Sequence, residues 1–186
     1  NTFASPVIQQ PLKLGASIVV HSTTKYINGH SDVVGGALIT SDDAIAERVG
    51  FYQNAIGGVP SPFDCYMVLR GIKTLPVRMR HQCRGAGLIA RRLEGRKGVK
   101  TVHYPGLESH PDHALAQRQM RLPGAMVSVD LDATVEQAKR FLSALRIFTL
   151  AESLGGVESL AEHPAIMTHA SIPKETRDAI GIYGRI

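Results

Sequence analysis

The sequence predicts an α/β protein that contains the end of a large α/β domain and a small α+β domain. The first part rests on two apolar runs, at residues 16–20 and 33–40, followed by a helix from Ala44, an order typical of the late part of an α/β sheet. The second part rests on short strands and an amphipathic helix from Val99 onwards. We therefore predict domains at residues 1–74 and 75–186, the second incomplete at its end.

The first domain is expected to begin with a strand end and a short helix over residues 6–12 that ends near Gly15. Residues 16–20 are apolar and β-branched and predict a buried strand, and residues 33–40 predict a second one. Ser41-Asp42-Asp43 is a capping sequence for the next helix. A loop rich in Gly and Pro then leads to a helix from Phe63 to about Arg70.

The second domain is expected to begin with a long helix that carries the chain from one domain to the other. Its apolar residues recur at spacings of three and four and form one stripe, made of Leu75, Met79, Cys83, Ala86, Ala90 and Leu93. Strands are predicted at 99–103, 125–131 and 148–151, with an amphipathic helix that starts at Thr134. Together they predict an antiparallel sheet with helices on one side.

The composition is that of an ordinary globular protein, with 44% hydrophobic and 20% charged residues in 186. No stretch is apolar enough over sufficient length for a membrane span, so we expect no membrane partner. The net charge of +5 arises from a basic run between Arg78 and Lys100. That run has no interleaved aromatic residues, so we interpret it as a solvated helix face and not as a nucleic-acid site. Cys65 and Cys83 form no CxxC pair, which predicts buried packing residues and a cytoplasmic location.

The strongest chemical signal is Ser22-Thr23-Thr24-Lys25, which follows the first predicted strand. Hydroxyls and turn amides at the end of a strand can hold an anion such as a phosphate. A lysine in a dry site beside them can act as a nucleophile or form a Schiff base. The alternative for this sequence is a surface turn with a solvated lysine.

Two other readings of polar residues compete with this one. Ser22 and Lys25 match the SxxK signature of serine acyl-transferases, but that signature belongs at a helix N-terminus and its supporting motifs are only partial here. His103, His110 and His113 have the residue type of metal ligands, but they lie in a loop broken by Pro and Gly with no cysteine nearby. We interpret that loop as solvated and predict no metal site.

A second candidate site follows the strand predicted at 148–151. Glu152 and Ser153 place a carboxylate and a hydroxyl at the strand end. Leu154 and then two glycines, Gly155 and Gly156, follow them in the sequence. This arrangement suits ligand contact, and it equally suits a helix cap or a turn.

Several stretches together resemble the Cys/Met-metabolism family of enzymes that depend on pyridoxal 5′-phosphate (PLP). The stretches occur in order over essentially the whole chain: residues 1–6, 21–26, 28–32, 60–64, 69–75, 151–160 and 167–170. The resemblance implies the fold-type I, aspartate-aminotransferase-like architecture. Residues 1–74 would then be the C-terminal part of the large PLP-binding domain, and residues 75–186 the small C-terminal α+β domain.

The resemblance also implies roles for individual residues. Lys25 is implied to be the catalytic lysine that forms a Schiff base with PLP, and Ser22 and Thr24 to be its phosphate-binding hydroxyls. Thr2 is implied to lie beside the cofactor ring. Glu152 and Ser153 are implied to contact a small sulfur amino-acid substrate, and Glu152 is expected to favour a substrate that has an amine at its far end.

The family implies trans-sulfuration, and the Glu-Ser-Leu-Gly sequence is most like that of cystathionine γ-lyases and γ-synthases. We therefore expect γ-elimination on cystathionine, with the γ-synthase reaction as the alternative, and a homotetramer. The family aspartate that binds the pyridinium nitrogen would precede Asn1, so we expect this chain to be a fragment. Arg185 lies near the position of a family arginine that binds the substrate carboxylate, but we do not assign it that role.

Overall fold

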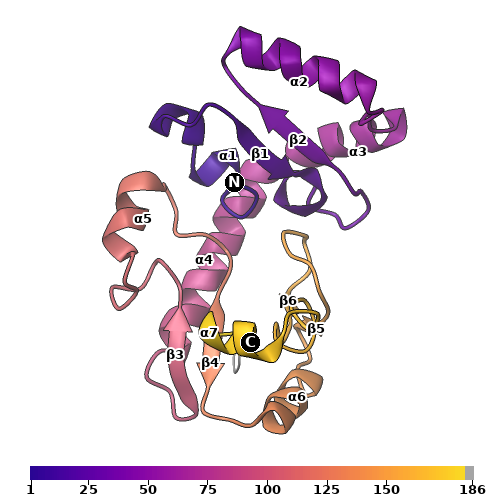
Figure 1. Ribbon diagram of the computed structural model, residues 1–186. Helices are drawn as coiled ribbons and strands as arrows, with labels where there is room; N and C mark the ends of the chain where they lie inside the picture. The colour runs from indigo at the N-terminus through magenta and orange to yellow at the C-terminus, as the bar shows by residue number, and fades with distance from the viewer. Residues whose placement is uncertain (183–186) are drawn as a thin grey trace.

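A computed structural model of the chain describes residues 1–182, arranged as two parts joined by one long helix (Figure 1). The upper part contains α1 (Ser5–Ile8), η1 (Pro11–Leu14), β1 (Val19–Ser22), η2 (Thr23–Ile27), β2 (Gly36–Ile39), α2 (Asp43–Ala55) and α3 (Pro62–Ile72). The connecting helix is α4 (Leu75–Leu93). The lower part contains β3 (Val99–His103), α5 (His113–Gln119), β4 (Ser128–Leu131), α6 (Val135–Ser143), β5 (Thr149–Leu150), β6 (Leu160–Ala161) and α7 (Lys174–Ala179).

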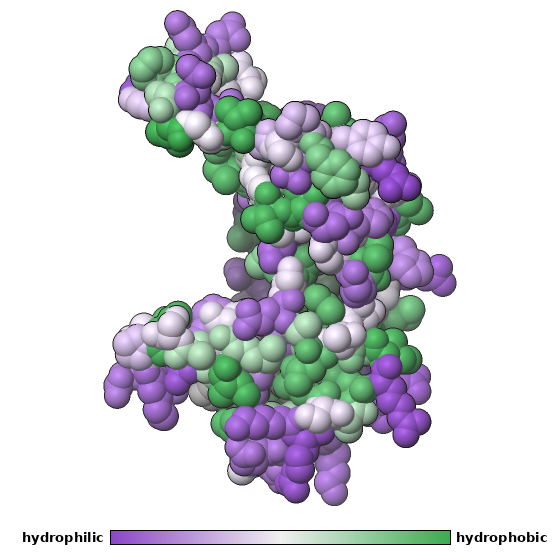
Figure 2. Space-filling view, turned by 90° about the vertical axis from the view of Figure 1, so that its right-hand side faces the viewer, coloured by the Kyte–Doolittle hydropathy of each residue, from purple (hydrophilic) through white to green (hydrophobic). Residues whose placement is uncertain are grey.

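Helix α4 packs against both parts and is the spine of the molecule. Its first half contributes to a core formed by Ala4, Ile8, Tyr26, Leu75, Met79 and Cys83. Its second half contributes to a core formed by Ala86, Ala90, Val102, Tyr104, Leu107 and Val129. The predicted stripe on this helix is thus confirmed for Leu75, Met79, Cys83, Ala86 and Ala90, which are buried, whereas Leu93 is only partly buried. Figure 2 shows that the outline of the molecule is hollowed between the two parts.

The strands form three two-stranded sheets among residues 1–182. The pairs β1–β2 and β3–β4 are antiparallel, and in the first pair Ser22 lies opposite Gly36. The pair β5–β6 is parallel. The expected antiparallel sheet of the second domain is therefore correct for β3 and β4. It is wrong for β5, because β5 and its partner β6 run in the same direction.

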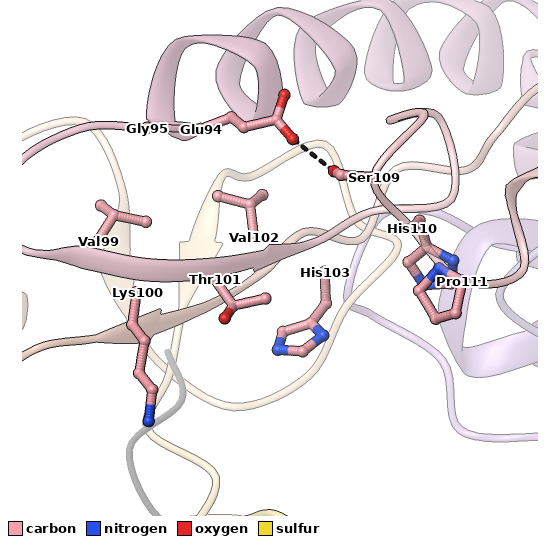
Figure 3. A pocket seen from close by; sticks show the side chains of 10 residues that line it. All are labelled: Glu94, Gly95, Val99, Lys100, Thr101, Val102, His103, Ser109, His110 and Pro111. Carbon is pink, nitrogen blue, oxygen red and sulfur yellow. Dashed lines mark hydrogen bonds between the residues drawn. The ribbon is translucent and has the colours of Figure 1, made fainter.

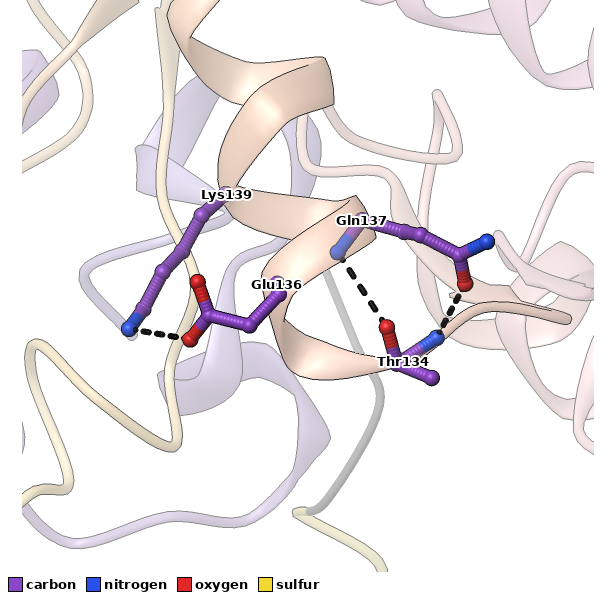
Figure 4. Close-up of polar contacts among 4 residues, drawn as sticks. All are labelled: Thr134, Glu136, Gln137 and Lys139. Carbon is purple, nitrogen blue, oxygen red and sulfur yellow. Dashed lines mark hydrogen bonds and ion pairs between the residues drawn. The ribbon is translucent and has the colours of Figure 1, made fainter.

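Local capping signals predicted several element starts well. Asp42 accepts a hydrogen bond from the amide of Ile45 at the start of α2, as expected from its sequence. Thr134 and Gln137 form a reciprocal capping box at the start of α6, and Lys139 pairs with Glu136 on its surface (Figure 4). These caps are determined by neighbouring residues, which is why the sequence reveals them.

Other predictions were wrong in detail. The single helix expected over residues 6–12 is two short helices, because Gln9 takes an extended conformation and Gln10, which precedes Pro11, is not helical either. The first strand lies two to three residues later than predicted, the second and fourth are shorter, and α5, β6 and α7 were not predicted.

Two side-chain predictions were also wrong. Arg78, expected on a solvated face, is only 9% exposed, although the other basic residues of the run between 80 and 100 are exposed. Cys65, expected to be buried, is exposed, whereas Cys83 is buried. Within residues 1–182, no helix combines the length and apolar character needed to cross a membrane.

Candidate active site

Lys25 lies in a distorted turn of π-helical type, Thr23–Ile27, which we call the lysine turn. Lys25 itself has φ −93° and ψ −128°, which are not helical values. The turn is fixed to the chain before β2, since the Thr23 amide donates to the Gly35 carbonyl at 2.9 Å and the Gly35 amide donates to Thr24 Oγ1 at 2.9 Å. A Cβ on Gly35 would lie 2.7 Å from Thr23 Oγ1, so this close approach depends on glycine.

The second predicted site, at Glu152 and Ser153, lies next to this lysine. Lys25 Nζ donates a hydrogen bond of 2.8 Å to Ser153 Oγ, although the two residues are 128 positions apart in sequence. Ser153 belongs to what we call the strand-end loop, residues 152–158 between β5 and β6. Its φ of 96° is in the left-handed region, which is costly for a residue with a side chain and is found most often at functional sites.

Gly155 holds the strand-end loop against the lysine turn. A Cβ at Gly155 would lie 2.5 Å from the amide nitrogen of Tyr26 and 2.9 Å from the carbonyl carbon of Lys25. Backbone therefore meets backbone at this point, and no side chain fits between. Gln82 of α4 adds a hydrogen bond of 2.8 Å from its Nε2 to the Gly156 carbonyl.

The lysine turn and the strand-end loop border a cavity of about 520 Å³. Its lining residues are Thr24, Ser31, Asp32, Val33, Val34, Ala151, Glu152, Ser153, Glu158 and Leu160. Asp32 Oδ1 accepts from Asn28 Nδ2 at 2.6 Å, and Glu158 Oε2 accepts from Ser31 Oγ at 3.0 Å. Glu152 is exposed and makes no hydrogen bond or ion pair within residues 1–182, so its carboxylate is available to a ligand.

The predicted residues are thus only partly brought together. Thr24, Glu152 and Ser153 line the cavity, and Lys25 reaches it through Ser153. Thr2 and Ser22 are joined to each other, because the Ser22 amide donates to Thr2 Oγ1 at 2.8 Å, but neither lines the cavity. Arg185 lies outside the described residues.

The residues of the lysine turn fit a phosphate-bearing aldehyde cofactor. Thr24 Oγ1 is oriented by the Gly35 amide and donates only a long bond of 3.3 Å to the Gly35 carbonyl, so its hydrogen can turn to an anion instead. Ser22 adds a second hydroxyl at the end of β1. With the primary amine of Lys25 beside them, this donor set matches the chemistry that PLP requires.

Burial shifts the pKa values of two titratable groups around the turn, His21 and Tyr26. Burial lowers the pKa of His21, which lies on β1. Burial chiefly raises the pKa of Tyr26 to about 12, with a contribution from nearby Cys83. Both shifts favour the uncharged form of the side chain, because burial penalises the charged form.

A smaller cavity of about 290 Å³ lies in the lower part, beside β3 (Figure 3). His103 and His110 line it, and Figure 3 shows the hydrogen bond between Glu94 and Ser109 at its edge. His103 Nε2 pairs with Asp130 Oδ2 at 2.8 Å, and His113 Nδ1 contacts the Pro105 carbonyl at 2.8 Å. In the part of the chain that the structure describes, no group of three or more His, Cys, Asp or Glu side chains is arranged to hold a metal ion.

Sequence reasoning missed four residues around the site: Asp32, Arg78, Gln82 and Glu158. Asp32 and Glu158 are in stretches that carried the family resemblance, so their sequence signal was present without a role. Arg78 and Gln82 are on α4, where a polar residue off the apolar stripe is expected to face water. Only the packing of α4 against the lysine turn and the strand-end loop gives them partners.

Comparison with known proteins places this geometry in a family. All residues, 1–186, match the family described as Cys/Met metabolism PLP-dependent enzyme. The chain is 55% identical over 98% of its length to a cystathionine beta-lyase of Coxiella burnetii, and 53% identical over 98% to a cystathionine gamma-lyase of Dictyostelium discoideum. It is 57% identical over 92% to a cystathionine gamma-synthase of Mycobacterium tuberculosis. These matches cover 47%, 47% and 44% of the relatives, so the chain spans about half their length.

Solved structures give the same result for the mixed α/β fold. A cystathionine gamma synthase from Xanthomonas oryzae in complex with cystathionine matches with a TM-score of 0.96 and 51% identity, over 100% of this chain and 48% of that one. A cystathionine gamma-lyase from Lactobacillus plantarum matches with a TM-score of 0.95 and 43% identity, over 100% and 49%. Relatives named for three different reactions are nearly equally similar, so similarity defines the family and leaves the reaction open. The chain belongs to the Cys/Met metabolism PLP-dependent enzyme family.

Proposed function

We propose that the protein catalyses γ-elimination on cystathionine, a trans-sulfuration reaction that gives cysteine, 2-oxobutanoate and ammonia. The observation that carries the proposal is the 2.8 Å contact between Lys25 Nζ and Ser153 Oγ at the edge of a 520 Å³ cavity. An amine held by a hydroxyl, beside a cavity with three carboxylates, suits proton abstraction from an amino acid that carries a second ammonium group.

In this proposal the upper part of the chain holds the cofactor. Lys25 would bind it covalently, the hydroxyls of Ser22 and Thr24 would hold its phosphate, and Thr2 would lie on the side of its ring. When bound, PLP supplies the electron sink that stabilises negative charge next to the substrate amine. Residues 1–74 are proposed to be the end of the PLP-binding domain of a fold-type I enzyme, and residues 75–186 the small C-terminal domain.

Lys25 is proposed to move the protons. Its Nζ removes the Cα proton of the bound amino acid and returns protons along the carbon chain, while Ser153 Oγ holds Nζ in position. The Cγ–S bond then breaks, and the sulfur leaves with a proton as the thiol of cysteine. One water is consumed when the four-carbon remainder is released as 2-oxobutanoate and ammonia.

Glu152 is proposed to select the substrate. Its carboxylate is exposed at the cavity and has no partner within residues 1–182, so it can bind the distal ammonium of cystathionine. Methionine carries only a methyl group on its sulfur, where cystathionine carries a second amino-acid arm with this ammonium. Glu152→Val should therefore reduce the preference for cystathionine over methionine, measured as the ratio of the two kcat/KM values. An unchanged ratio would remove this role from Glu152.

The γ-synthase reaction, in which cysteine replaces the acyl group of an O-acylhomoserine, is the second candidate. The 57% identity to the Mycobacterium tuberculosis gamma-synthase supports it. An SxxK acyl-transferase mechanism is not supported, because Lys25 Nζ contacts Ser153 and not Ser22.

The test uses the full-length protein loaded with PLP. Incubation with cystathionine should release cysteine and 2-oxobutanoate in equal amounts, and Lys25→Ala should lower the rate by about 10²–10⁴-fold, the usual effect of losing a general base. Cystathionine formation from an O-acylhomoserine and cysteine, without 2-oxobutanoate from cystathionine, would favour the γ-synthase. Activity that survives in Lys25→Ala would contradict both reactions.

Assembly and location complete the proposal. Exposed apolar side chains cover the α2–α3 region, namely Phe51, Tyr52, Ile56, Val59, Phe63, Tyr66 and Leu69. Clustered exposed apolar side chains are typical of protein–protein interfaces, which supports a homo-oligomer, and we propose a tetramer. The mass of the full-length protein by light scattering tests this. Two free thiols, at Cys65 and Cys83, support a cytoplasmic location.

A further inference from the structure

The lysine turn leaves backbone acceptors that its own helix does not satisfy. The carbonyls of Thr23 and Lys25 accept from the amides of Asn28 and Gly29, at 3.0 and 2.8 Å. The carbonyls of Tyr26 and Ile27 come next, and both residues are buried. A buried carbonyl needs a donor from elsewhere in the fold, because water cannot supply one.

Arg78 supplies these donors from the first turns of α4. Its Nη1 donates to the Tyr26 carbonyl at 2.8 Å, and its Nη2 donates to the Ile27 carbonyl at 3.4 Å. The same guanidinium donates to the Gly71 carbonyl at 3.0 Å and, through Nε, to Thr74 Oγ1 at 2.9 Å. One rigid fork of donors thus joins the lysine turn, the end of α3 and the start of α4.

The surrounding backbone is shaped to admit this guanidinium. Gly29 has φ +75°, and a Cβ there would lie 2.1 Å from Arg78 Nη1 and 2.4 Å from Cζ. A Cβ on Gly71 would lie 2.2 Å from the Asn28 carbonyl oxygen. Both glycines are required for close approach, so the Arg78 site is a built part of the fold and not a side chain folded inwards by chance.

No carboxylate forms an ion pair with Arg78 within residues 1–182. Its partners are three backbone carbonyls and one hydroxyl. A buried cation held only by backbone acceptors is an expensive way to stabilise a fold, since apolar packing serves as well. Two of its acceptors are the carbonyls one and two residues after Lys25, which points to an effect of Arg78 on the shape of the lysine turn.

We propose that Arg78 is a positioning residue that holds the lysine turn in its non-helical shape and so directs Lys25 Nζ at Ser153 and at the bound amino acid. This inference rests on the proposed function, because it gives Arg78 a role in the reaction of Lys25. Arg78 touches neither Ser153 nor the cavity; it acts through the backbone of Tyr26 and Ile27. A displacement of about 1 Å at Nζ is enough to cost about 10²-fold in rate.

The test compares Arg78→Met and Arg78→Lys with Arg80→Met in the full-length PLP-loaded protein. Arg80 is exposed on the same helix and serves as the matched control. Arg78→Met should lower kcat for cystathionine by about 10²-fold with little change in KM, because binding groups in the cavity remain. Arg78→Lys should fall in between, since an ammonium cannot reach two carbonyls as a fork does. Arg80→Met should match the wild type.

A second readout does not depend on turnover. In the PLP-free protein, the rate at which Lys25 reacts with acetic anhydride, measured by peptide mass spectrometry and divided by that of Lys13, should change in Arg78→Met and remain unchanged in Arg80→Met. If the wild type binds PLP but does not cleave cystathionine, the proposed reaction is wrong, while this ratio still decides the role of Arg78. A kcat and a labelling ratio within twofold of the wild type in Arg78→Met would overturn the inference.

Gly29→Ala approaches the same contact from the other side and remains informative if Arg78→Met does not fold. Its Cβ should displace the guanidinium and reproduce the loss in kcat. Gly15→Ala has φ +96° with nothing within 4 Å, so it controls for backbone strain alone. The effects of Gly29→Ala and Arg78→Lys should be less than additive in the double variant. Additive effects would mean that Gly29 and Arg78 act separately, which also overturns the inference.

Discussion

The lysine turn and the strand-end loop meet at one hydrogen bond, yet they are held in opposite ways. In the lysine turn, Tyr26 and Ile27 are buried, and Arg78 satisfies their carbonyls. In the strand-end loop, Glu152, Ser153, Val157 and Glu158 are exposed. That loop depends on a two-residue strand on either side and on a few polar contacts with the upper part.

This difference separates two tasks at the proposed active site. The proposed reactive amine, Lys25, is in the lysine turn, where many buried contacts hold its backbone in one conformation. The groups that face the substrate are on the side with few contacts, where substitutions change what binds at little cost in stability. Relatives with three different reactions share the chain at 53–57% identity, as expected if specificity resides in such exposed positions.

Gly155→Ala should give the largest effect, because it separates the two regions. The new Cβ would lie 2.5 Å from the Tyr26 amide nitrogen at φ +83°. We expect the free energy of unfolding to fall by about 1–3 kcal/mol, from strain and overpacking together. The loss in kcat should be larger than the loss of folded protein alone would cause, because the substitution moves Ser153 away from Lys25. Urea unfolding and steady-state kinetics measure the two effects.

Gly98→Ala is the control for that variant. Gly98 has nearly the same φ, +86°, with nothing within 4 Å of a new Cβ. It should therefore show the strain of a left-handed residue, about 1–2 kcal/mol, and normal activity. Equal activity losses in the two variants would mean that contact between the loop and the turn does not matter.

Ser153→Ala should give a smaller effect that is confined to the reaction. It removes the acceptor that orients Lys25 Nζ, and because a misplaced catalytic group lowers the rate, kcat should fall about tenfold or more. Stability should stay within about 0.5 kcal/mol, because the side chain is exposed. Ser159→Ala, at an exposed serine of the same segment, should leave kcat unchanged. A large stability loss in Ser153→Ala would contradict the division of tasks.

The smallest effect concerns acid stability of the segment after β6. His163 is 0% exposed, neither ring nitrogen has a hydrogen-bond partner, and burial lowers its pKa below 6.5. The unfolded chain therefore binds more protons below pH 6.5, so this contribution to stability is complete above pH 6.5 and is lost as pH falls towards the folded-state pKa. His163→Phe should flatten the fall in urea midpoint between pH 7 and 5.

The pKa of His21, on β1 before the lysine turn, is also lowered by burial. Part of the loss of stability at acid pH should therefore remain in His163→Phe. His81→Phe, at an exposed histidine of α4, should leave the slope unchanged. A slope in His163→Phe as steep as in the wild type would show that His163 does not couple protons to folding.

Part of the site was predictable because its signals are local or belong to one stretch. The sequence Ser22-Thr23-Thr24-Lys25 after a strand predicts an anion-binding turn with a reactive amine. Glu152 and Ser153 at a strand end predict ligand contact, and the structure brings both to the cavity that Thr24 lines.

Other parts were not predictable because they depend on long-range packing. The sequence pattern does not distinguish the arginines of α4 from one another, yet among them only Arg78 is buried, where it contacts the lysine turn. The parallel pairing of β5 with β6 depends on where the chain turns between them, and each strand has only two residues, too few for a pattern.

The sequence by itself determined several of the elements and the residue types that gather at the candidate site. Periodicity located α4, capping residues located α2 and α6, a run of hydroxyls with a lysine predicted an anion-binding turn with a reactive amine, and the family resemblance implied the cofactor. Only the tertiary structure decided that Lys25 meets Ser153, 128 residues away, and that Arg78 donates to a carbonyl of the lysine turn. The physical reason is that capping and periodicity act within a few residues, whereas burial and backbone approach depend on which distant surfaces pack together.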